Sequence, residues 1–332
     1  MLTAYDLRGG RLVRLSPDEC RPGALPRPQG LLWVDLLDPT RDEERAVEAL
    51  FGIEIPTRQE MAEIEESSRL YEERGALVLT ALVINGVTEG RPARTQVTFV
   101  LTPDHLVTVR YADPVPFRSM EARLARQPEA HGSSDRLMAS LLDSIVERAA
   151  DVLEGVAADL YDVSTRVFYD TDGLPASPGR ASDDLQALIR RLGRKNLTMS
   201  ILRESLLSLG RLLPYLRQEG EEWLQNGVPA RLKGLERDVR SLQAYEAQLS
   251  SEITFLHDAT LGLINLEQNR IIKVFSIAAV LFLPPTLVGT IYGMNFEHMP
   301  ELRWALGYPW ALGLMLLSAV LPYWWFKRRG WL

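Results

Sequence analysis

Two long uncharged runs near the C-terminus constrain this chain more than any other feature. The first fills the 23 residues between Lys273 and Glu297, and the second fills the 23 residues between Arg303 and Lys327. As helices, runs of this length span roughly 35 Å, which exceeds the ~30 Å hydrocarbon thickness of a bilayer. A buried core helix is the alternative for one such run, but two of equal length joined by a short loop predict a pair of membrane spans.

Charge separates the rest of the chain from these runs. Residues 1–272 hold 32 Lys and Arg against 42 Asp and Glu, whereas residues 273–332 carry a net charge of +3. No apolar signal sequence follows Met1, and the single cysteine, Cys20, excludes an intramolecular disulfide framework. We therefore expect residues 1–272 to form a soluble cytoplasmic portion.

Basic residues flank the two expected spans on one side. Arg270 and Lys273 precede the first span and Lys327, Arg328 and Arg329 follow the second, while the connecting loop holds one arginine and two glutamates. Five of the seven tryptophans lie in the last thirty residues, where amphipathic rings suit membrane interfaces. The positive-inside rule predicts that both termini face the cytoplasm.

The N-terminal third mixes strand and helix patterns. Apolar and β-branched segments predict strands at 11–15, 31–36, 76–84, 95–101 and 105–111. The turn Thr102-Pro103-Asp104 predicts that the last two strands form a hairpin. Helices are expected at 38–53 and 56–66, since each segment opens near a proline with acidic residues in its first turns. These elements predict an α/β domain.

Helical periodicity dominates from Ser133 onward. A break with glycine and proline at 173–180 precedes a second helix through about Leu216, which predicts a helical hairpin. Beyond it, leucines recur every seven residues from Leu235 to Leu263. No proline interrupts this stretch before Pro284, so residues 229–296 are expected to form one helical rod of about 100 Å. The leucine seam fits a buried core helix or a subunit-associating stalk, and its continuation into a span favours the stalk.

The expected segments follow from these patterns. They are an α/β domain at 1–132, a helical hairpin at 133–227, a stalk helix at 228–272, a first transmembrane helix at 273–296, an outer loop at 297–307, a second transmembrane helix at 308–326 and a basic cytoplasmic tail at 327–332.

Reactive groups of the kind an enzyme needs do not converge in the sequence. The four histidines are scattered without metal-ligand spacing, and no P-loop motif exists to cradle nucleotide phosphates. The net negative charge argues against nucleic acid. An oligomeric channel, a sensor and a membrane-tethered scaffold all remain compatible with these features, and neither an enzyme nor a nucleotide-driven pump is expected.

One face of the first span separates these alternatives. At helical spacing it carries small or neutral polar side chains with two bulky apolar interruptions, a set that comprises Asn269, Ile272, Ser276, Ala279, Leu283, Thr286 and Thr290. Back-bonding to the helix's own carbonyls, or contact with another helix, would explain any single member. As an aligned set, these residues favour a pore lined by several copies of the helix.

No carboxylate lies on this face, which bears on the ion. Mg²⁺ gives up its water shell reluctantly, so neutral oxygens suit binding of the hydrated ion through its waters. Asn295, with the backbone carbonyls of Gly293 and Met294, is expected to form such a site at the outer mouth. Glu297 and Glu301 are expected to raise the local cation concentration there.

These residues carry a family resemblance. The segment YGMNFEHMPEL at 292–302, preceded by EQNRIIKVF and FLPPTLV and followed by GYP and KRRGWL, resembles the CorA magnesium transporter family, whose signature is the Gly-Met-Asn tripeptide. The similarity is strongest over 256–332, and the same order of domains extends over the whole chain.

The resemblance implies a funnel-shaped homopentamer in the bacterial inner membrane, in which the first spans surround the pore and the ring of Gly293, Met294 and Asn295 captures hydrated Mg²⁺. Asn269 matches a polar ring at the inner mouth, and Thr286 matches an inner polar position. The hydrophobic gate positions are matched by Ile272, Phe275 and Leu283. Thr290 departs from the glycine that some members carry, which leaves the pore width at that turn open.

A regulatory metal site is also implied by the resemblance. Glu63 and Asp238 match carboxylates that bind a divalent ion between adjacent subunits in relatives, so internal Mg²⁺ is expected to favour a closed state. For both residues a solvated helix carboxylate is the alternative. Co²⁺ and Ni²⁺ remain open as transported ions beside Mg²⁺, and no organic cofactor is expected. A zinc transporter of the same superfamily and a non-conducting scaffold are the remaining alternatives.

Overall fold

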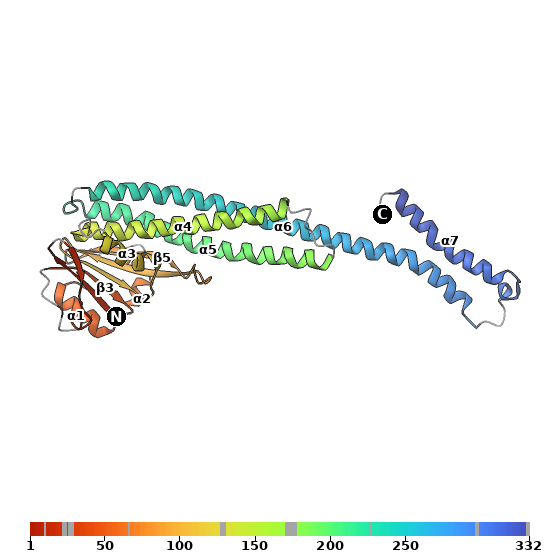
Figure 1. The fold of residues 1–332 in the computed structure, drawn as a ribbon, viewed down its shortest axis with the longest axis horizontal. Coiled ribbons are helices and arrows are strands. Elements are labelled where there is room, and N and C mark those ends of the chain that lie inside the picture. Colours follow the sequence, from red (N-terminus) through yellow and green to blue (C-terminus); the bar gives the residue numbers. More distant parts are fainter. Residues whose placement is uncertain are drawn as a thin grey trace. The chain divides into compact units, whose positions relative to one another are not determined.

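The structure is a computed structural model of the 332-residue chain. It describes residues 1–9, 11–21, 25, 30–65, 67–126, 131–169, 178–225, 227–295 and 299–329. The chain divides into two compact units, one of Met1–Asp170 with Ile189–His257 and one of Thr171–Leu188 with Asp258–Leu332. The first contains a sheet with a helical bundle, and the second contains two apolar helices (Figure 1).

A mixed sheet organises the N-terminal part of the first unit. Within the described residues its order is β2-β1-β3-β7-β6-β5-β4, with β3 and β7 parallel and the other neighbours antiparallel. The strands are β1 Leu2–Arg8, β2 Arg11–Arg14, β3 Leu31–Leu37, β4 Leu70–Glu73, β5 Ala76–Asn85, β6 Ala93–Leu101 and β7 Leu106–Arg110. The five expected strands and the hairpin between the last two are confirmed, whereas β1 and β4 were not predicted.

Short helices cover the sheet. Val47 of α1 (Arg41–Phe51) belongs to one apolar cluster with Val78, Val100 and Val107, which lie in register across β5, β6 and β7. The alternate residues of β6 face the other way, where Phe99 stacks on Phe117 of α3 (Val115–Arg126) at 6.4 Å. Because both faces of the central strands are covered, these strands are apolar almost throughout.

The helix expected over 56–66 is wrong in its length. In this segment the structure has the short helix α2, Arg58–Met61, and a capping box between Thr57 and Glu60 caps its N-terminus. Met61 is buried, but the next apolar residue, Ile64, is 86% exposed. A continued helix would therefore have no apolar face to pack, and a short helix without tertiary contacts is not stable.

Parts of three long helices form the rest of the first unit: α4 (Ser134–Phe168), α5 (Pro178–Glu219) from Ile189 onward, and α6 (Val228–Tyr292) as far as His257. They run side by side in Figure 1. Arginines join them pairwise: Arg191 of α5 contacts Asp159 and Asp162 of α4, Arg203 of α5 contacts Glu246 of α6, and Arg231 of α6 contacts Asp143 of α4. The expected hairpin is thus part of a three-helix bundle, and the break at 173–180 lies mostly outside the described residues.

The bundle also contacts the sheet through backbone groups. Ser205 of α5 donates to the carbonyl of Leu82 at 2.7 Å, and the Leu82 N–H donates to the Ser208 hydroxyl at 3.0 Å. β4 pairs with β5 only as far as Leu79, so Leu82 lies beyond that ladder. The two serines therefore satisfy backbone groups that the sheet leaves open on this edge.

The leucine seam of α6 is buried in part within a single chain. Leu235, Leu249 and Leu256 are each less than 5% exposed, as are Val239 and Ile253. Leu242 and Leu263 are only half-buried. The buried members therefore pack within their own chain, as the alternative of a core helix expects, and the association of the stalk with other subunits stays a prediction.

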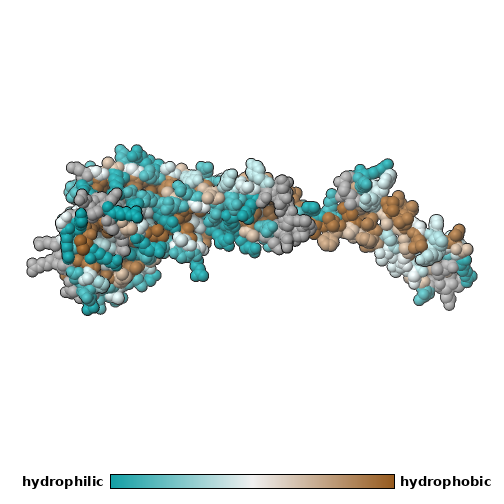
Figure 2. Space-filling model, viewed as in Figure 1, coloured by the Kyte–Doolittle hydropathy of each residue, from teal (hydrophilic) through white to brown (hydrophobic). Residues whose placement is uncertain are grey.

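The second unit carries the two apolar helices. α6 continues without a break to Tyr292, and α7 spans Gly307–Arg328, preceded by a short 3-10 helix, η3, at Pro300–Arg303. Both helices are long and apolar enough to cross a membrane, and only 6% of each apolar window is buried. Apolar residues form large patches on the visible surface of the two helices, between more polar residues (Figure 2). The continuous helix expected from 229 onward is confirmed up to Tyr292.

Candidate ion pathway

Gly293, Met294 and Asn295 form the turn that directly follows α6. The Gly293 N–H donates to the carbonyls of Gly289 and Thr290 at 3.0 and 3.2 Å, and the Met294 N–H donates to the carbonyl of Ile291 at 3.2 Å. These bonds use the backbone N–H groups of Gly293 and Met294. All three residues of the tripeptide are exposed, and within the described part of the chain the Asn295 side chain bonds to no other group. The Asn295 amide oxygen and the backbone carbonyl oxygens of the tripeptide are therefore exposed acceptors that a ligand could use.

The helix itself adds to the attraction for a cation. The turn lies at the C-terminal end of α6, where aligned peptide dipoles produce a partial negative charge of about half an elementary charge. The carbonyls in the last turn of a helix also lack donors within the helix. The tripeptide thus combines a neutral oxygen set with the negative end of a dipole, and it does so without a carboxylate.

The residues expected to line a pore share one exposed face of α6. All of them are exposed in the single chain, namely Asn269, Ile272, Phe275, Ser276, Ala279, Leu283, Thr286 and Thr290. From Ile277 onward the opposite face is only half-exposed, as at Leu281, Pro285 and Val288. The chain therefore covers one side of this helix and leaves the predicted pore side open.

Two threonines on this face are back-bonded to the helix. The Thr286 hydroxyl donates to the carbonyl of Phe282 at 2.7 Å, and the Thr290 hydroxyl donates to the carbonyl of Thr286 at 2.8 Å. The single chain therefore shows the back-bonding that was the alternative to pore lining for these residues. It does not remove their use in a pore, because a hydroxyl that donates to the backbone still has lone pairs to accept from the waters of a hydrated ion.

Glycines shape the packing behind the tripeptide. A cavity of about 390 Å³ between the end of α6 and the start of α7 has walls that include Gly289, Gly293 and Gly307. A Cβ on Gly289 would lie 3.2 Å from the methyl carbon of Met315. Gly293 was expected as part of the tripeptide, whereas Gly289 and Gly307 were not predicted, although the four-residue spacing of Gly289 and Gly293 at the end of a helix is a usable signal.

Only one of the two acidic residues expected at the outer mouth can be placed. Glu301 lies in η3, is half-exposed and lines the same cavity as Gly293. Glu297 lies outside the described residues. Glu301 is therefore close to the tripeptide turn, on the side where α7 begins.

The two expected regulatory carboxylates are exposed in the first unit. Glu63 follows α2 and its backbone carbonyl accepts from Arg69 Nε at 2.6 Å, while Asp238 lies on α6. Among the described residues of one chain, no three His, Cys, Asp or Glu side chains are grouped so that they could hold a metal ion. The role of Glu63 and Asp238 in a regulatory site therefore stays a prediction.

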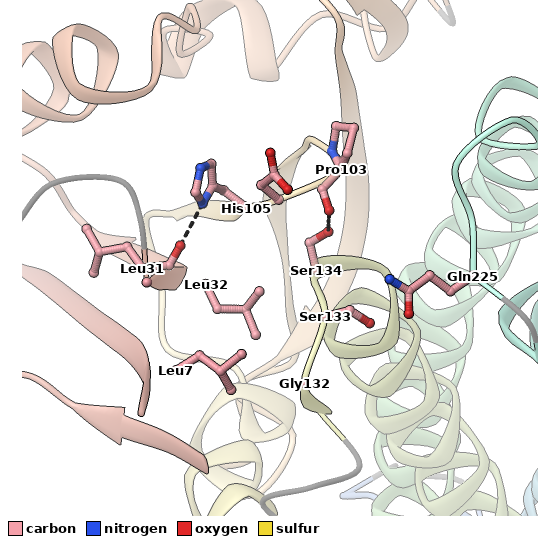
Figure 3. Close-up of a pocket in the computed structure, with 11 residues that line it drawn as sticks. Leu7, Leu31, Leu32, Pro103, His105, Gly132, Ser133, Ser134 and Gln225 are labelled. Atoms are coloured by element: carbon pink, nitrogen blue, oxygen red, sulfur yellow. Dashed lines mark hydrogen bonds between the residues drawn. The ribbon is translucent and has the colours of Figure 1, made fainter. Parts of the chain in front are cut away.

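A cavity of about 620 Å³ lies between the sheet and the start of α4 (Figure 3). His105 points to the Leu31 carbonyl, with Nδ1 2.6 Å from that oxygen, and Ser134 donates to the Pro103 carbonyl at 2.8 Å. These polar groups are thus bonded to backbone of their own chain. They connect β3, the β6–β7 turn and α4, and this cavity is not part of the ion pathway.

Comparison with known proteins gives one consistent result. The family model described as "CorA-like Mg2+ transporter protein" matches residues 28–328. A curated relative, "Magnesium transport protein CorA" of Escherichia coli (strain K12), is 33% identical over the full length of both chains, and the protein of the same name from Yersinia pseudotuberculosis is 34% identical, again over the full length of both.

Solved structures agree on the fold. The complete CorA magnesium transporter of Methanocaldococcus jannaschii has a TM-score of 0.75 at 17% identity, and the match covers 100% of this chain and 99% of that one. The cytoplasmic domain of ZntB from Vibrio parahaemolyticus has a TM-score of 0.57 at 10% identity and covers 79% of this chain and 97% of that one. This chain has an α/β domain, a long helix and two apolar helical segments at its C-terminus, the first of which is the end of the long helix α6.

Proposed function

Because the chain belongs to the CorA-like Mg²⁺ transporter family, we propose that it forms a gated channel through which Mg²⁺ enters the cell passively, with its water shell largely retained at the outer mouth. The protein is a membrane transporter for Mg²⁺. Co²⁺ and Ni²⁺ belong to the proposal as further substrates, because a site that contacts the water shell discriminates weakly among ions with similar shells.

The exposed face of α6 is the observation that carries this proposal. It places Asn269, Ser276 and Thr286 on the side of the helix that the chain leaves uncovered. Polar side chains that faced lipid would each cost free energy, so they belong next to water or protein. Facing a water-filled axis, they line a path that leads to Asn295.

Two helices of one chain cannot enclose such a path, so the proposal includes several subunits. Resemblance to the family sets the number at five, a homopentamer in which α6 of each subunit faces the axis. The subunits would lie in the bacterial inner membrane with both termini in the cytoplasm, since Lys327 and Arg328 end α7 on the side where α6 enters.

Selectivity in this proposal comes from acceptors. The waters of hydrated Mg²⁺ present hydrogens outward, and a ring of Asn295 amide oxygens with the carbonyls of Gly293 and Met294 accepts from them. Direct ligation by carboxylates would hold the ion too firmly for rapid release. Glu301, and Glu297 in the same loop, would concentrate cations before they enter.

The membrane potential supplies the driving force. A divalent ion gains roughly 4.6 kcal/mol on crossing to an interior at about −100 mV, which is about 2.3 kcal/mol per charge. Influx therefore needs no nucleotide hydrolysis. Closure would occur at the apolar rings of Ile272, Phe275 and Leu283, which are all more than 60% exposed in the single chain and can exclude water when they approach one another.

Feedback by internal Mg²⁺ completes the proposal. Glu63 and Asp238 of adjacent subunits would share the ion, which would screen the repulsion between acidic subunits and favour the closed state. When internal Mg²⁺ falls, the population would shift toward open. The double variant Glu63→Ala with Asp238→Ala is expected to keep transporting at high internal Mg²⁺, and normal shutdown of that variant would remove both residues from the regulatory site.

The test of the proposed function is flux into liposomes that contain the purified protein. With a negative interior we expect Mg²⁺ influx that cobalt hexaammine, an inert mimic of the six-water ion, inhibits competitively. Influx without any competition by the hexaammine would mean that bare ions are selected. A non-conducting scaffold would give no influx under any potential, and a zinc transporter would carry Zn²⁺ in preference to Mg²⁺.

A further inference from the structure

Four cationic side chains are among the residues that line a second cavity of the first unit. It has a volume of about 510 Å³ and lies between the β5–β6 turn, α4 and α5. Arg91 comes from the turn, Arg148 from α4, and Arg194 and Lys195 from α5, whereas Asp151 is the one carboxylate among the lining residues. Three separate elements thus bring positive charge to one place in a portion of the chain whose net charge is negative.

Most of this charge is not neutralised. Lys195 is paired with Asp159, but Arg148 bonds only to the Thr88 hydroxyl, at 3.3 Å. Across the part of the chain that the structure describes, no carboxylate pairs with Arg148, Arg91 or Arg194. The bundle's other arginines behave differently, since those that join its helices all contact carboxylates. Three arginines that line one cavity and form no ion pair with the described residues, beside the single carboxylate of Asp151, offer guanidinium donors to an anion.

Apolar side chains from the same three elements also line the cavity, and we call them its apolar wall. Val87 and Pro92 of the turn, Val152 and Val156 of α4 and Leu197 of α5 form it, and Leu197 is 55% exposed. An inorganic anion would leave this wall in contact with water. A ligand with an organic body beside its anionic group would cover the wall and reach the arginines at the same time.

Gly155 keeps the cavity open on the α4 side. No atom lies within 4 Å of the position that a Cβ would take there. A glycine inside a helix costs about 1 kcal/mol relative to alanine, so it is an unfavourable choice for helix stability alone. A larger side chain at this position would project into open space at the cavity and would not disturb the packing of the bundle.

We propose that this cavity binds a phosphorylated small molecule of nucleotide size, with its phosphates on Arg91, Arg148 and Arg194 and its organic body on the apolar wall. Guanidinium groups bind phosphate oxygens in pairs, and 510 Å³ lies within the range of ~300–1,000 Å³ typical of small-molecule sites. The missing P-loop argued against nucleotide hydrolysis, whereas this site requires binding only. It would replace the expectation that the chain has no nucleotide partner, and it is independent of the ion pathway.

The test is calorimetric titration of the purified full-length protein with ADP, ATP and pyrophosphate in the absence of Mg²⁺. We expect saturable binding of ADP and ATP, with one molecule bound per chain. Arg194→Gln should weaken it about tenfold, the effect of losing one charge-assisted hydrogen bond, and Gly155→Leu should abolish it by filling the cavity. Arg190→Gln is the matched control, since this exposed arginine of α5 does not line the cavity.

Three outcomes would overturn the proposal. The first is no heat of binding with millimolar ADP and ATP, and the second is equal weakening by Arg190→Gln and Arg194→Gln, which would indicate attraction to surface charge in general. The third is equal affinity for pyrophosphate and ADP, because the apolar wall would then contribute nothing. Arg194→Lys, which keeps the charge, should bind more tightly than Arg194→Gln and shows that the loss is not due to unfolding.

Discussion

Gly307 is the position where the smallest substitution should most disturb the outer mouth. It is buried at the first residue of α7, and its N–H donates to the carbonyl of Trp304 at 3.1 Å. A Cβ added there would lie 3.3 Å from the carbonyl carbon of Glu301 and would overlap the attached oxygen. That oxygen would have to move by on the order of 1 Å before ordinary separations of ~3.5 Å were restored. Because it belongs to η3, the movement would reach the loop that leads back to Asn295.

The expected cost follows from this overlap. Forcing an atom into a packed site typically costs about 1–3 kcal/mol. If the loop absorbs it by displacement, the population with an intact outer mouth falls by roughly five- to 150-fold, at 1.4 kcal/mol per tenfold. Gly313→Ala in the same helix is the control. No atom lies within 4 Å of a Cβ there, so alanine should be neutral or should stabilise α7 by up to ~1 kcal/mol.

The assay is Mg²⁺ influx into liposomes, combined with the thermal midpoint of the solubilised protein. We expect Gly307→Ala to lose at least about 80% of the influx and to unfold at a lower temperature, and Gly313→Ala to resemble the wild type in both. If Gly307→Ala kept the influx and the thermal midpoint of the wild type, this reasoning would be refuted, because the Glu301 carbonyl would then move at no cost in free energy.

Two further predictions concern the first unit. Asp35→Ala should lower the free energy of unfolding by about 3 kcal/mol, because it removes a carboxylate partner of the buried Arg110. This loss is near the low end of the usual range, since Arg110 keeps its ion pair with Asp113. A urea midpoint unchanged from wild type would contradict this prediction. Burial alone would raise the pKa of Asp159, but hydrogen bonds from Lys195 and Arg191 outweigh it and lower that pKa below 3.8. A lowered carboxyl pKa stabilises the fold above pH 3.8, and this stabilisation is lost as the pH falls through the folded-state pKa. Arg191→Met should therefore lower the free energy of unfolding at neutral pH, and its free energy of unfolding should differ less from that of the wild type in acid. A difference that grows toward low pH would contradict the assignment.

Residue patterns predicted the elements that have a strong period or an unusual length. The uncharged runs, the hairpin closed by Pro103 and the long helix from Val228 follow directly from them. β4 could not be predicted in this way, because two of the four residues of LYEE are glutamates, which are uncommon in strands, and the segment is a strand through its pairing with β5. Helix α3 was hidden by Pro114 and Pro116, which read as loop residues. In the structure Pro116 lies in the first turn, where a missing N–H costs nothing.

The candidate sites divide in the same way, into residues that a sequence pattern predicts and residues that only the tertiary fold brings together. Spacing alone placed Asn269 through Thr290 on one face, because the face of a regular helix follows from its period. Spacing could not say which partners the heptad leucines have, and the chain itself buries Leu235, Leu249 and Leu256. It also could not find the cationic cavity, since Arg91, Arg148 and Arg194 are far apart in the sequence and meet only through the tertiary fold.

Chemical accessibility of α6 tests the central claim most directly, namely that the face with Thr286 lines a water-filled axis. The only native cysteine, Cys20, is buried and can be replaced by serine. In that background, a charged, membrane-impermeant thiol reagent should block Mg²⁺ influx through Thr286→Cys at low internal Mg²⁺ and should leave influx through Val288→Cys, on the opposite face, unchanged. Influx through Thr286→Cys that the reagent does not alter, or equal block at both positions, would contradict a pore along this face.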